Sequence, residues 1–236
     1  MFGNYKYDVY KLTGKIIIDS FAIEQVHNVK FLGVNIDSKL TWRNHISQIS
    51  QIISRNIGVL YKVRSKVDES VLLTLYNVLI LPHLMYCNIV WGSASKTILD
   101  PLVKLQKRAV RIIARATYIA HTNPLFGKYC ILKLEDMYRL QILLFVYNCR
   151  FPPCAKSICN FYYRFQFLSS FSNYSTRNSE RTLYIPYFRT EIRRNSTKIM
   201  GAYINNSYLN LTDMPSSDIM KSYIKKYFIN SYNDVC

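Results

Sequence analysis

The spacing of apolar residues changes its period along the chain. Residues 15–18 and 29–36 are runs of β-branched and aromatic residues, a composition typical of β-strands. From Thr41 to about Val63 the apolar residues instead recur every three or four positions, which indicates one buried face of an α-helix. We therefore expect short antiparallel strands followed by a long helix. The apolar positions of this helix are Ile46, Ile49, Ile53, Ile57 and Leu60.

The next stretch, residues 70–95, contains no Lys, Arg, Asp or Glu. It is long enough to span a bilayer, which leaves a basic membrane-associated protein as an alternative. However, Asn77, Pro82, His83 and Asn88 would then lie in or near the hydrocarbon, where unpaired polar groups cost free energy. We therefore favour helices buried in a protein core.

Two residues indicate how this uncharged stretch is divided. Asp68 is suited to cap a helix that runs to Leu81. Pro82 would redirect the chain into another helix, which reaches Trp91 and ends at Gly92.

Residues 99–117, LDPLVKLQKRAVRIIARAT, predict a helix with two opposite faces. Asp100 and Pro101 suit its start, because an Asx side chain accepts free backbone N–H groups and proline has none to lose. At about 100° per residue, apolar side chains gather on one face and basic side chains on the other. The apolar set is Leu102, Leu105, Ala109, Ile112, Ile113 and Ala116. The basic set is Lys104, Lys107, Arg108, Arg111 and Arg115.

Two further helices are predicted downstream, over residues 134–148 and 217–232. Between them, residues 161–171 are aromatic without a period, and residues 174–200 are rich in Ser, Thr, Asn and Arg, so we expect less regular structure there. The expected buried face of the first helix is Met137, Leu140, Leu144 and Tyr147. The expected buried face of the last helix is Ile219, Tyr223, Tyr227 and Phe228, opposite Lys221, Lys225 and Lys226.

The predicted fold class is α+β and mainly α, with a less regular basic region at the C-terminal end. The chain has 236 residues, half of them apolar, which is enough to bury a core. Its net charge of +17 favours a polyanionic partner, nucleic acid first and an acidic membrane surface second. Residues 99–150 carry nine Lys and Arg against three Asp and Glu, and residues 151–236 carry eleven against five.

Cysteine usage and the N-terminus indicate an intracellular protein. A chain of this length and apolar fraction needs no disulfides, so we interpret its six cysteines as reduced thiols. Cys149, Cys154 and Cys159 are evenly spaced, but no histidine follows His121 and no Cys-x-x-Cys pair occurs, so we expect no metal site. The N-terminus has no apolar signal core.

The sequence offers no recognisable catalytic arrangement. Its four histidines lie far apart in the sequence, and its seven glycines form no phosphate-binding loop. We expect His83, inside the apolar run, to be a buried neutral imidazole hydrogen-bonded to the backbone. The acid pairs Asp68-Glu69 and Glu135-Asp136 are explained as first-turn residues that interact favourably with a helix dipole.

Several blocks of sequence, taken in order, carry a family resemblance. They are VKFLGVNIDSKLTWRNHI, LLTLYNVLILPHLMYCNIVWGSA, LVKLQKRAVRIIARATYIAHTNPLF, and NYSTRNS with PYFRT. Together they resemble the C-terminal part of the reverse transcriptase encoded by non-LTR (LINE-like) retrotransposons of the jockey and CR1 type. The resemblance extends from about Lys15 to the end of the chain.

The resemblance implies an architecture. In that family the segment similar to Phe31-Leu32-Gly33 is the primer grip, a hairpin at the end of the palm, and the helices after it form the thumb along the template-primer duplex. Residues 1–38 would then be a palm-end β segment with a primer-grip-like hairpin. Residues 39–150 would be a helical thumb-like domain, and residues 151–236 an aromatic and basic C-terminal region that ends in a short helix.

The same resemblance indicates what this chain lacks. Polymerase chemistry in the intact family enzyme uses Mg²⁺ ions held by palm carboxylates, which include an Asp-Asp pair, and this chain contains no Asp-Asp. We therefore expect a truncated fragment that retains template-primer binding elements, has no cofactor of its own and has no polymerase activity alone. The palm would come from a longer reading frame or from a separate palm-containing chain.

The expected partner is RNA, DNA or an RNA-DNA hybrid. No acid interrupts residues 103–118, unlike the mixed charges of an ordinary solvated face, and further arginines occur downstream among tyrosines suited to stack on bases. A solvated surface and a structural or interaction remnant remain the alternatives. The predicted nucleic-acid-binding residues are Lys104, Lys107, Arg108, Arg111, Arg115, Arg177, Arg189, Arg193 and Arg194.

Overall fold

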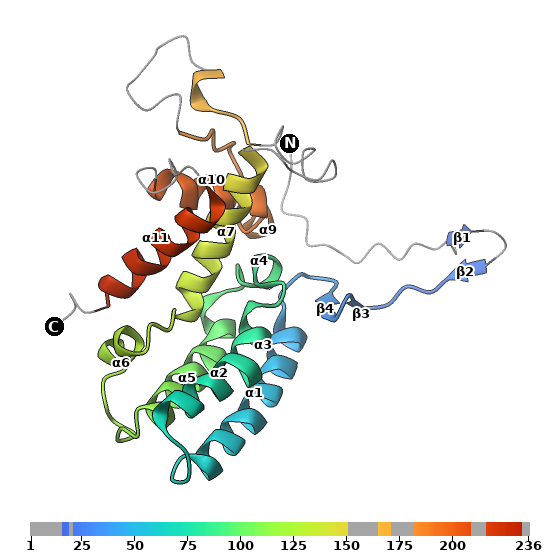
Figure 1. Ribbon diagram of the computed structural model, residues 1–236. Helices are drawn as coiled ribbons and strands as arrows, with labels where there is room; N and C mark the ends of the chain where they lie inside the picture. Colours follow the sequence, from blue (N-terminus) through green and yellow to red (C-terminus); the bar gives the residue numbers. More distant parts are fainter. Residues whose placement is uncertain (1–15, 19–20, 151–164, 171–181, 209–215, 233–236) are drawn as a thin grey trace.

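Helices make up most of the structure. In the computed structural model, residues 16–18, 21–150, 165–170, 182–208 and 216–232 are described (Figure 1). Short strands come first and helices follow, so the predicted α+β, mainly α class is confirmed. The described helices are α1 (Arg43–Val63), α2 (Glu69–Leu79), α3 (Leu81–Met85), α4 (Asn88–Trp91), α5 (Lys96–Ile113), α6 (Asn123–Lys128), α7 (Leu134–Arg150), the 3-10 helix η1 (Leu168–Ser170), α9 (Glu191–Arg194), α10 (Thr197–Ser207) and α11 (Ser217–Asn230).

Two separate antiparallel hairpins precede the helices and extend to the right in Figure 1. The run 29–36 is divided by Leu32 and Gly33, whose φ angles of 44° and 80° are both positive and form a two-residue turn. A Cβ on Gly33 would lie 3.5 Å from the Tyr86 ring, so this glycine serves the turn rather than the approach of another backbone. The strand pairs are β1 (Ile16–Ile18) with β2 (Phe21–Ile23), and β3 (Asn28–Phe31) with β4 (Val34–Asp37).

Asp37 fixes the connection between β4 and α1. Its carboxylate accepts hydrogen bonds from the backbone N–H groups of Lys39 (3.1 Å), Thr41 (3.0 Å) and Trp42 (2.7 Å). Burial of Asp37 opposes its ionisation, but these donors outweigh burial and lower the pKa of Asp37. The ionised carboxylate therefore determines where the first long helix begins relative to the hairpin.

The first long helix buries the face that the sequence predicts. This helix, α1, begins at Arg43, two residues after the predicted start at Thr41, and it packs lengthwise on α5. Because its apolar stripe is continuous, the helix can cover the core along its whole length. The predicted apolar positions, all buried, are Ile46, Ile49, Ile53, Ile57 and Leu60.

The uncharged stretch 70–95 forms α2, α3 and α4 instead of two helices. The chain leaves helical geometry at Tyr86 and Cys87, where Cys87 has a φ of 50°, and the Trp91 indole N–H donates to the Tyr86 carbonyl at 2.8 Å. The predicted continuous helix from Pro82 to Trp91 is therefore wrong. Among the described residues, no helix is both long enough and apolar enough to cross a membrane.

His45, rather than His83, is the buried histidine. The Asn35 N–H donates to His45 Nδ1 at 3.4 Å, and the imidazole packs edge-on against Trp91 with ring centroids 5.8 Å apart. Burial lowers the pKa of His45. His83 is only half-buried, because α3 turns Leu84 fully inward instead, so the prediction of a buried His83 is wrong.

The seventh helix, α7, lies between two groups of helices. It contacts α3, α4 and α5 on one side and α10 and α11 on the other, as Figure 1 shows. Met137, Leu140 and Tyr147 are buried as predicted, whereas Leu144 is half-buried. Since both sides are covered, this helix buries more than one face. The additional buried apolar residues are Leu134, Tyr138, Ile142, Leu143, Val146 and Cys149.

One buried amide joins α2, α5 and α7. The Gln106 Nε2 group donates to the Tyr76 hydroxyl at 3.1 Å and to the Leu132 carbonyl at 2.8 Å. Its Oε1 accepts from the Leu134 N–H at 3.0 Å. Burial raises the pKa of Tyr76 to about 12, so this hydroxyl stays protonated. All three elements are therefore fixed by one side chain.

Tyr232 attaches the C-terminal end of the described chain to the start of α7. Its hydroxyl donates to Asp136 Oδ2 at 2.5 Å and accepts from the Lys133 N–H at 3.1 Å. Burial, and then the bond to Asp136, raise the pKa of Tyr232. Asp136 also pairs with Arg139 at 3.0 Å. The acid lies in the first helical turn, as predicted, but it also binds a residue far along the chain.

The buried face of α11 differs from the prediction. Both candidate faces repeat every four residues, so the period alone fits either of them. Contact with α7 selects the face that includes Phe228, which packs edge-on against Tyr208 with centroids 5.5 Å apart. The buried residues are Met220, Ile224, Phe228 and Ile229. Of the predicted apolar positions, Ile219, Tyr223 and Tyr227 are exposed, as are Lys221, Lys225 and Lys226.

We expect Gln106→Leu to lower the free energy of unfolding by about 3 kcal/mol, because a buried hydroxyl, carbonyl and N–H each lose their partner. Urea denaturation followed by circular dichroism measures this loss. Gln51→Leu, on the exposed side of α1, is the matched control and should change stability by less than about 0.5 kcal/mol. Equal effects of the two substitutions would contradict the structural role of Gln106.

We also expect His45 to make stability depend on pH. Because burial lowers its pKa below the ordinary value of 6.5, the unfolded chain binds a proton before the folded protein does. Stability should therefore fall as the pH decreases from about 7.5 to about 5.5. Thermal unfolding should show that the stability of His45→Leu falls less over this pH range than the stability of the wild-type protein. The control variant, His83→Leu, should lose as much stability as the wild-type protein. An unchanged pH dependence in His45→Leu would refute this.

Candidate nucleic-acid interface

The outer side of α5 carries basic side chains and its inner side carries apolar ones, as predicted. Lys104 and Arg108 are exposed, and Lys107 and Arg111 are half-buried beside them. We call these four residues the basic face. Leu105, predicted to be apolar core, is only half-buried. The predicted apolar residues that are buried are Leu102, Ala109, Ile112 and Ile113.

This helix begins one turn earlier than predicted. Ser95 has an extended backbone, and its carbonyl accepts from the N–H groups of Ile98 (2.9 Å) and Leu99 (3.1 Å). Asp100 is therefore inside α5, where it pairs with Lys104 at 2.6 Å instead of capping the helix. The predicted start at Asp100 is wrong because a serine suited to the N-cap position lies upstream.

The helix also ends earlier than predicted, before Arg115. Arg115 has a φ of 50°, and the Ala116 N–H turns back to the Arg111 carbonyl at 3.0 Å. The Arg115 guanidinium donates to the Val67 carbonyl at 2.7 Å. The prediction that Arg115 lies in the helical stripe is therefore wrong, since this side chain holds the neighbouring connection between α1 and α2.

The basic face is only partly neutralised by the protein. Lys104 pairs with Asp100, but within the described part of the chain neither Lys107 nor Arg108 has an ion pair. Burial, and the positive charge of Lys107, lower the pKa of Lys133 against the attraction of Asp136. The Lys133 ammonium, which lies 4.0 Å from the centroid of the Tyr232 ring, is therefore repelled by the positive charge of Lys107. A polyanion placed here would relieve this repulsion.

The downstream basic residues are only partly described. Arg177 lies outside the described residues, as do Arg181 and Tyr174. Arg189 and Arg193 are exposed around α9, and the Arg189 guanidinium lies 6.0 Å from the centroid of the Tyr187 ring. In this segment an arginine and a tyrosine thus lie side by side at one position.

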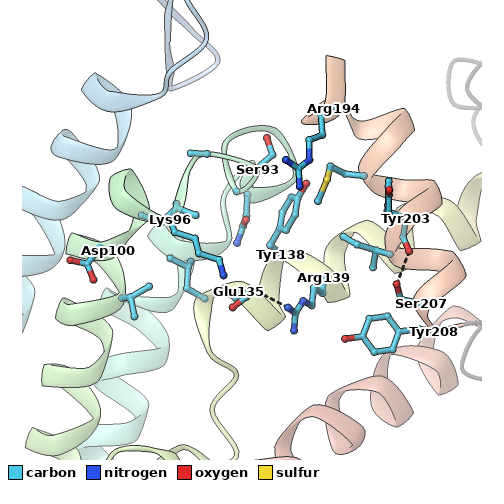
Figure 2. A pocket seen from close by; sticks show the side chains of 18 residues that line it. Ser93, Lys96, Asp100, Glu135, Tyr138, Arg139, Arg194, Tyr203, Ser207 and Tyr208 are labelled. Carbon is cyan, nitrogen blue, oxygen red and sulfur yellow. Dashed lines mark hydrogen bonds and ion pairs between the residues drawn. The ribbon is translucent and has the colours of Figure 1, made fainter. Parts of the chain in front are cut away.

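A cleft of about 620 Å³ joins the start of α5 to this downstream segment (Figure 2). Lys96 enters it from α5, Arg139 from α7 and Arg194 from α9. Arg139 is held by Glu135 at 2.6 Å, and Arg194 pairs with Glu191 at 3.3 Å. The structure therefore brings Arg194 near the start of α5, although the basic face itself lies farther along that helix.

The predicted primer-grip-like residues form the end of the β3–β4 hairpin. Phe31 ends β3, and Leu32 and Gly33 make the turn. The Tyr86 hydroxyl donates to the Leu32 carbonyl at 2.6 Å, which ties the turn to the break between α3 and α4. The side chains of Phe31 and Leu32 are exposed. The turn of this hairpin is thus positioned by the helices but not covered by them.

The described residues do not fit a pair of Mg²⁺ ions. None of their His, Cys, Asp or Glu side chains form a group of three or more that could hold a metal ion. Asp37, the described acid nearest the hairpin turn in sequence, has its carboxylate engaged by backbone N–H groups. We therefore derive no metal-dependent step from this part of the chain.

Comparison with curated proteins gives similarity to mobile-element polymerases. Over 127 residues, 52% of this chain, it is 27% identical to the RNA-directed DNA polymerase from mobile element jockey of Drosophila funebris. Over 47% of its length, this chain is 25% identical to the probable RNA-directed DNA polymerase from transposon X-element of Drosophila melanogaster. Over 45% of its length, it is 29% identical to the RNA-directed DNA polymerase from mobile element jockey of the same species.

About half of this chain is thus similar to RNA-directed DNA polymerases of non-LTR mobile elements. The family resemblance carried by the sequence blocks is confirmed over this part. The matched regions span 12% to 14% of the length of these relatives. No family model matches the chain, and no solved structure matches it.

Sequence reasoning missed two residues beside the basic face. Lys133 adds a charge from the connection that leads into α7. Tyr118, in the connection between α5 and α6, lies with its ring centroid 5.8 Å from Arg111 Cζ. The arginine also donates to the Ala120 carbonyl at 3.0 Å. Both residues follow the helix in sequence, but no periodic pattern marks them, because neither lies in a helix.

Proposed function

We propose that this chain binds template-primer nucleic acid, RNA, DNA or their hybrid, through phosphates on the basic face of α5. The observation that carries the proposal is a cationic helix surface without ion pairs for Lys107 and Arg108 among the described residues. The similarity to RNA-directed DNA polymerases supports nucleic acid as the polyanion. Contacts of this kind position a duplex without reading its sequence.

The chemistry proposed for these residues is binding and not phosphoryl transfer. The sequence contains no Asp-Asp pair, and the described carboxylates do not gather into a metal site. Polymerase catalysis depends on metal ions that bridge the reacting phosphates. The basic face would instead hold the duplex while a palm, in a longer protein or a separate chain, performs the reaction.

We expect Lys107→Glu combined with Arg108→Glu to lower the affinity for an RNA-DNA hybrid at least about tenfold at about 50 mM salt. The slope of log affinity against log salt should also become shallower by about 2, because two phosphate contacts are lost. Fluorescence anisotropy with a labelled hybrid duplex measures both quantities.

A control with the same change in charge separates local contact from overall charge. Arg55→Glu combined with Lys62→Glu alters the exposed side of α1 and should leave the affinity within about threefold of the wild-type value. If both double variants lose affinity equally, or if wild-type affinity does not vary with salt, the basic face is only a solvated surface.

A second function is favoured by the exposed β3–β4 hairpin. We propose that it docks against a palm-containing protein chain. In the part of the chain described, β3 and β4 pair only with each other. The outer edge of β4 lies against α1, where His45 accepts from the Asn35 N–H, but the outer edge of β3 is open to further pairing. Large hydrophobic side chains gather here without a cover. They are Val26, Val29, Phe31 and Leu32.

We expect the isolated chain to self-associate through this hairpin, and Phe31→Ser combined with Leu32→Ser to reduce that association. Sedimentation velocity over a range of concentrations measures it. Val71→Ser combined with Val78→Ser, two exposed positions on α2, is the control and should leave association unchanged. Equal association of all three proteins would exclude the hairpin as the surface of self-association and leave the docking proposal without support.

A further inference from the structure

The connection between α5 and α6 exposes two large hydrophobic side chains at its tip. Tyr118 is 83% exposed and Ile119 is 86% exposed, more than any other large hydrophobic side chain in the described part of the protein. In Figure 1 this connection is the loop at the lower left, between α5 and α6. The proposed binding of phosphates gives these residues no role.

The tip is nevertheless held in one conformation. Arg111 donates to the Ala120 carbonyl at 3.0 Å on one side of it, and the Ala120 N–H donates to the Thr117 carbonyl at 3.1 Å. Arg115, just before the tip, is fixed to the Val67 carbonyl. Because these bonds order the backbone in advance, less conformational entropy is lost when the tip binds a partner.

The Tyr118 ring lies beside the positive charges of the basic face. Arg111 Cζ is 5.8 Å from the ring centroid. Tyr118 is also close enough to contribute, after Asp100, to the raised pKa of Lys104. An aromatic ring with cations beside it matches the two parts of a nucleotide, since a base stacks on the ring while its phosphate meets the cations.

We propose that Tyr118 and Ile119 form a stacking site for an unpaired base of the nucleic acid held by the basic face. Stacking needs a free face of the base, which a continuous duplex does not offer, since neighbouring pairs cover it. An unpaired base beside a duplex offers one. Tyr118 stacks on that base, and Ile119 packs against its edge as an apolar wedge.

This inference rests on the proposed function and adds to it a preference for one kind of nucleic acid, a duplex with an unpaired base beside it. The basic face alone binds any duplex by its phosphates. With the stacking site, the protein favours a duplex that continues into a single strand over a blunt duplex. The site is tolerant of sequence, because every base has a face that can stack.

The test compares two labelled RNA-DNA hybrids, one blunt and one with a short single-stranded extension that carries 2-aminopurine next to the duplex. Tyr118→Ala should lower the affinity for the extended hybrid about tenfold and leave the affinity for the blunt hybrid within about twofold. Tyr118→Phe should retain the wild-type affinity, because the ring and not the hydroxyl stacks. Binding of wild-type protein should quench the 2-aminopurine, and binding of Tyr118→Ala should not.

Tyr61→Ala is the matched control, because Tyr61, on α1, is also exposed (52%) and also lies beside an arginine, Arg64. It should leave both affinities and the quenching unchanged. If Tyr118→Ala binds and quenches like the wild-type protein, or loses affinity equally for both hybrids, the stacking site is refuted while phosphate binding stands. If the wild-type protein binds neither hybrid, the proposed function fails and this inference fails with it.

Discussion

The buried amide of Gln106 is the interaction on which the arrangement of the helices depends. It satisfies a hydroxyl from α2, a carbonyl before α7 and the first N–H of α7. A buried polar group is costly unless its partners are all present, so this network permits few other orientations of α5. With Gln106 directed inward, the basic residues on the opposite side of the same helix must face outward. The core thus determines where the positive charge is displayed.

The separation of basic and apolar sides on α5 suits the proposed binding of nucleic acid. Phosphate contacts require charge on a rigid surface and little else, and a helix packed along its full length provides that surface. The relatives that this chain resembles are much longer proteins, of which it matches between 12% and 14%. Under the proposed function, the matched part holds the duplex and another part of the polymerase catalyses the reaction.

The sequence predicts the structure well where one local pattern decides it. The five apolar positions of α1 and the two faces of α5 are examples, since each helix has a single continuous apolar stripe. Prediction fails where distant contacts decide. α11 offers two equivalent stripes, and only its contact with α7 chooses between Ile224 and Tyr223. The early end of α5 at Arg115 and the break at Cys87 use a left-handed backbone at residues other than glycine, which no local preference indicates.

The bond between Tyr232 and Asp136 has a consequence for the order of events during synthesis. The two residues are 96 positions apart, so the carboxylate leaves the ribosome long before the hydroxyl that will pair with it. α1 to α5 can assemble early, while α7 stays covered on one side only. α10 and α11 close the other side last. A premature stop codon just before α11 would therefore leave the apolar side of α7 that α11 covers exposed to solvent.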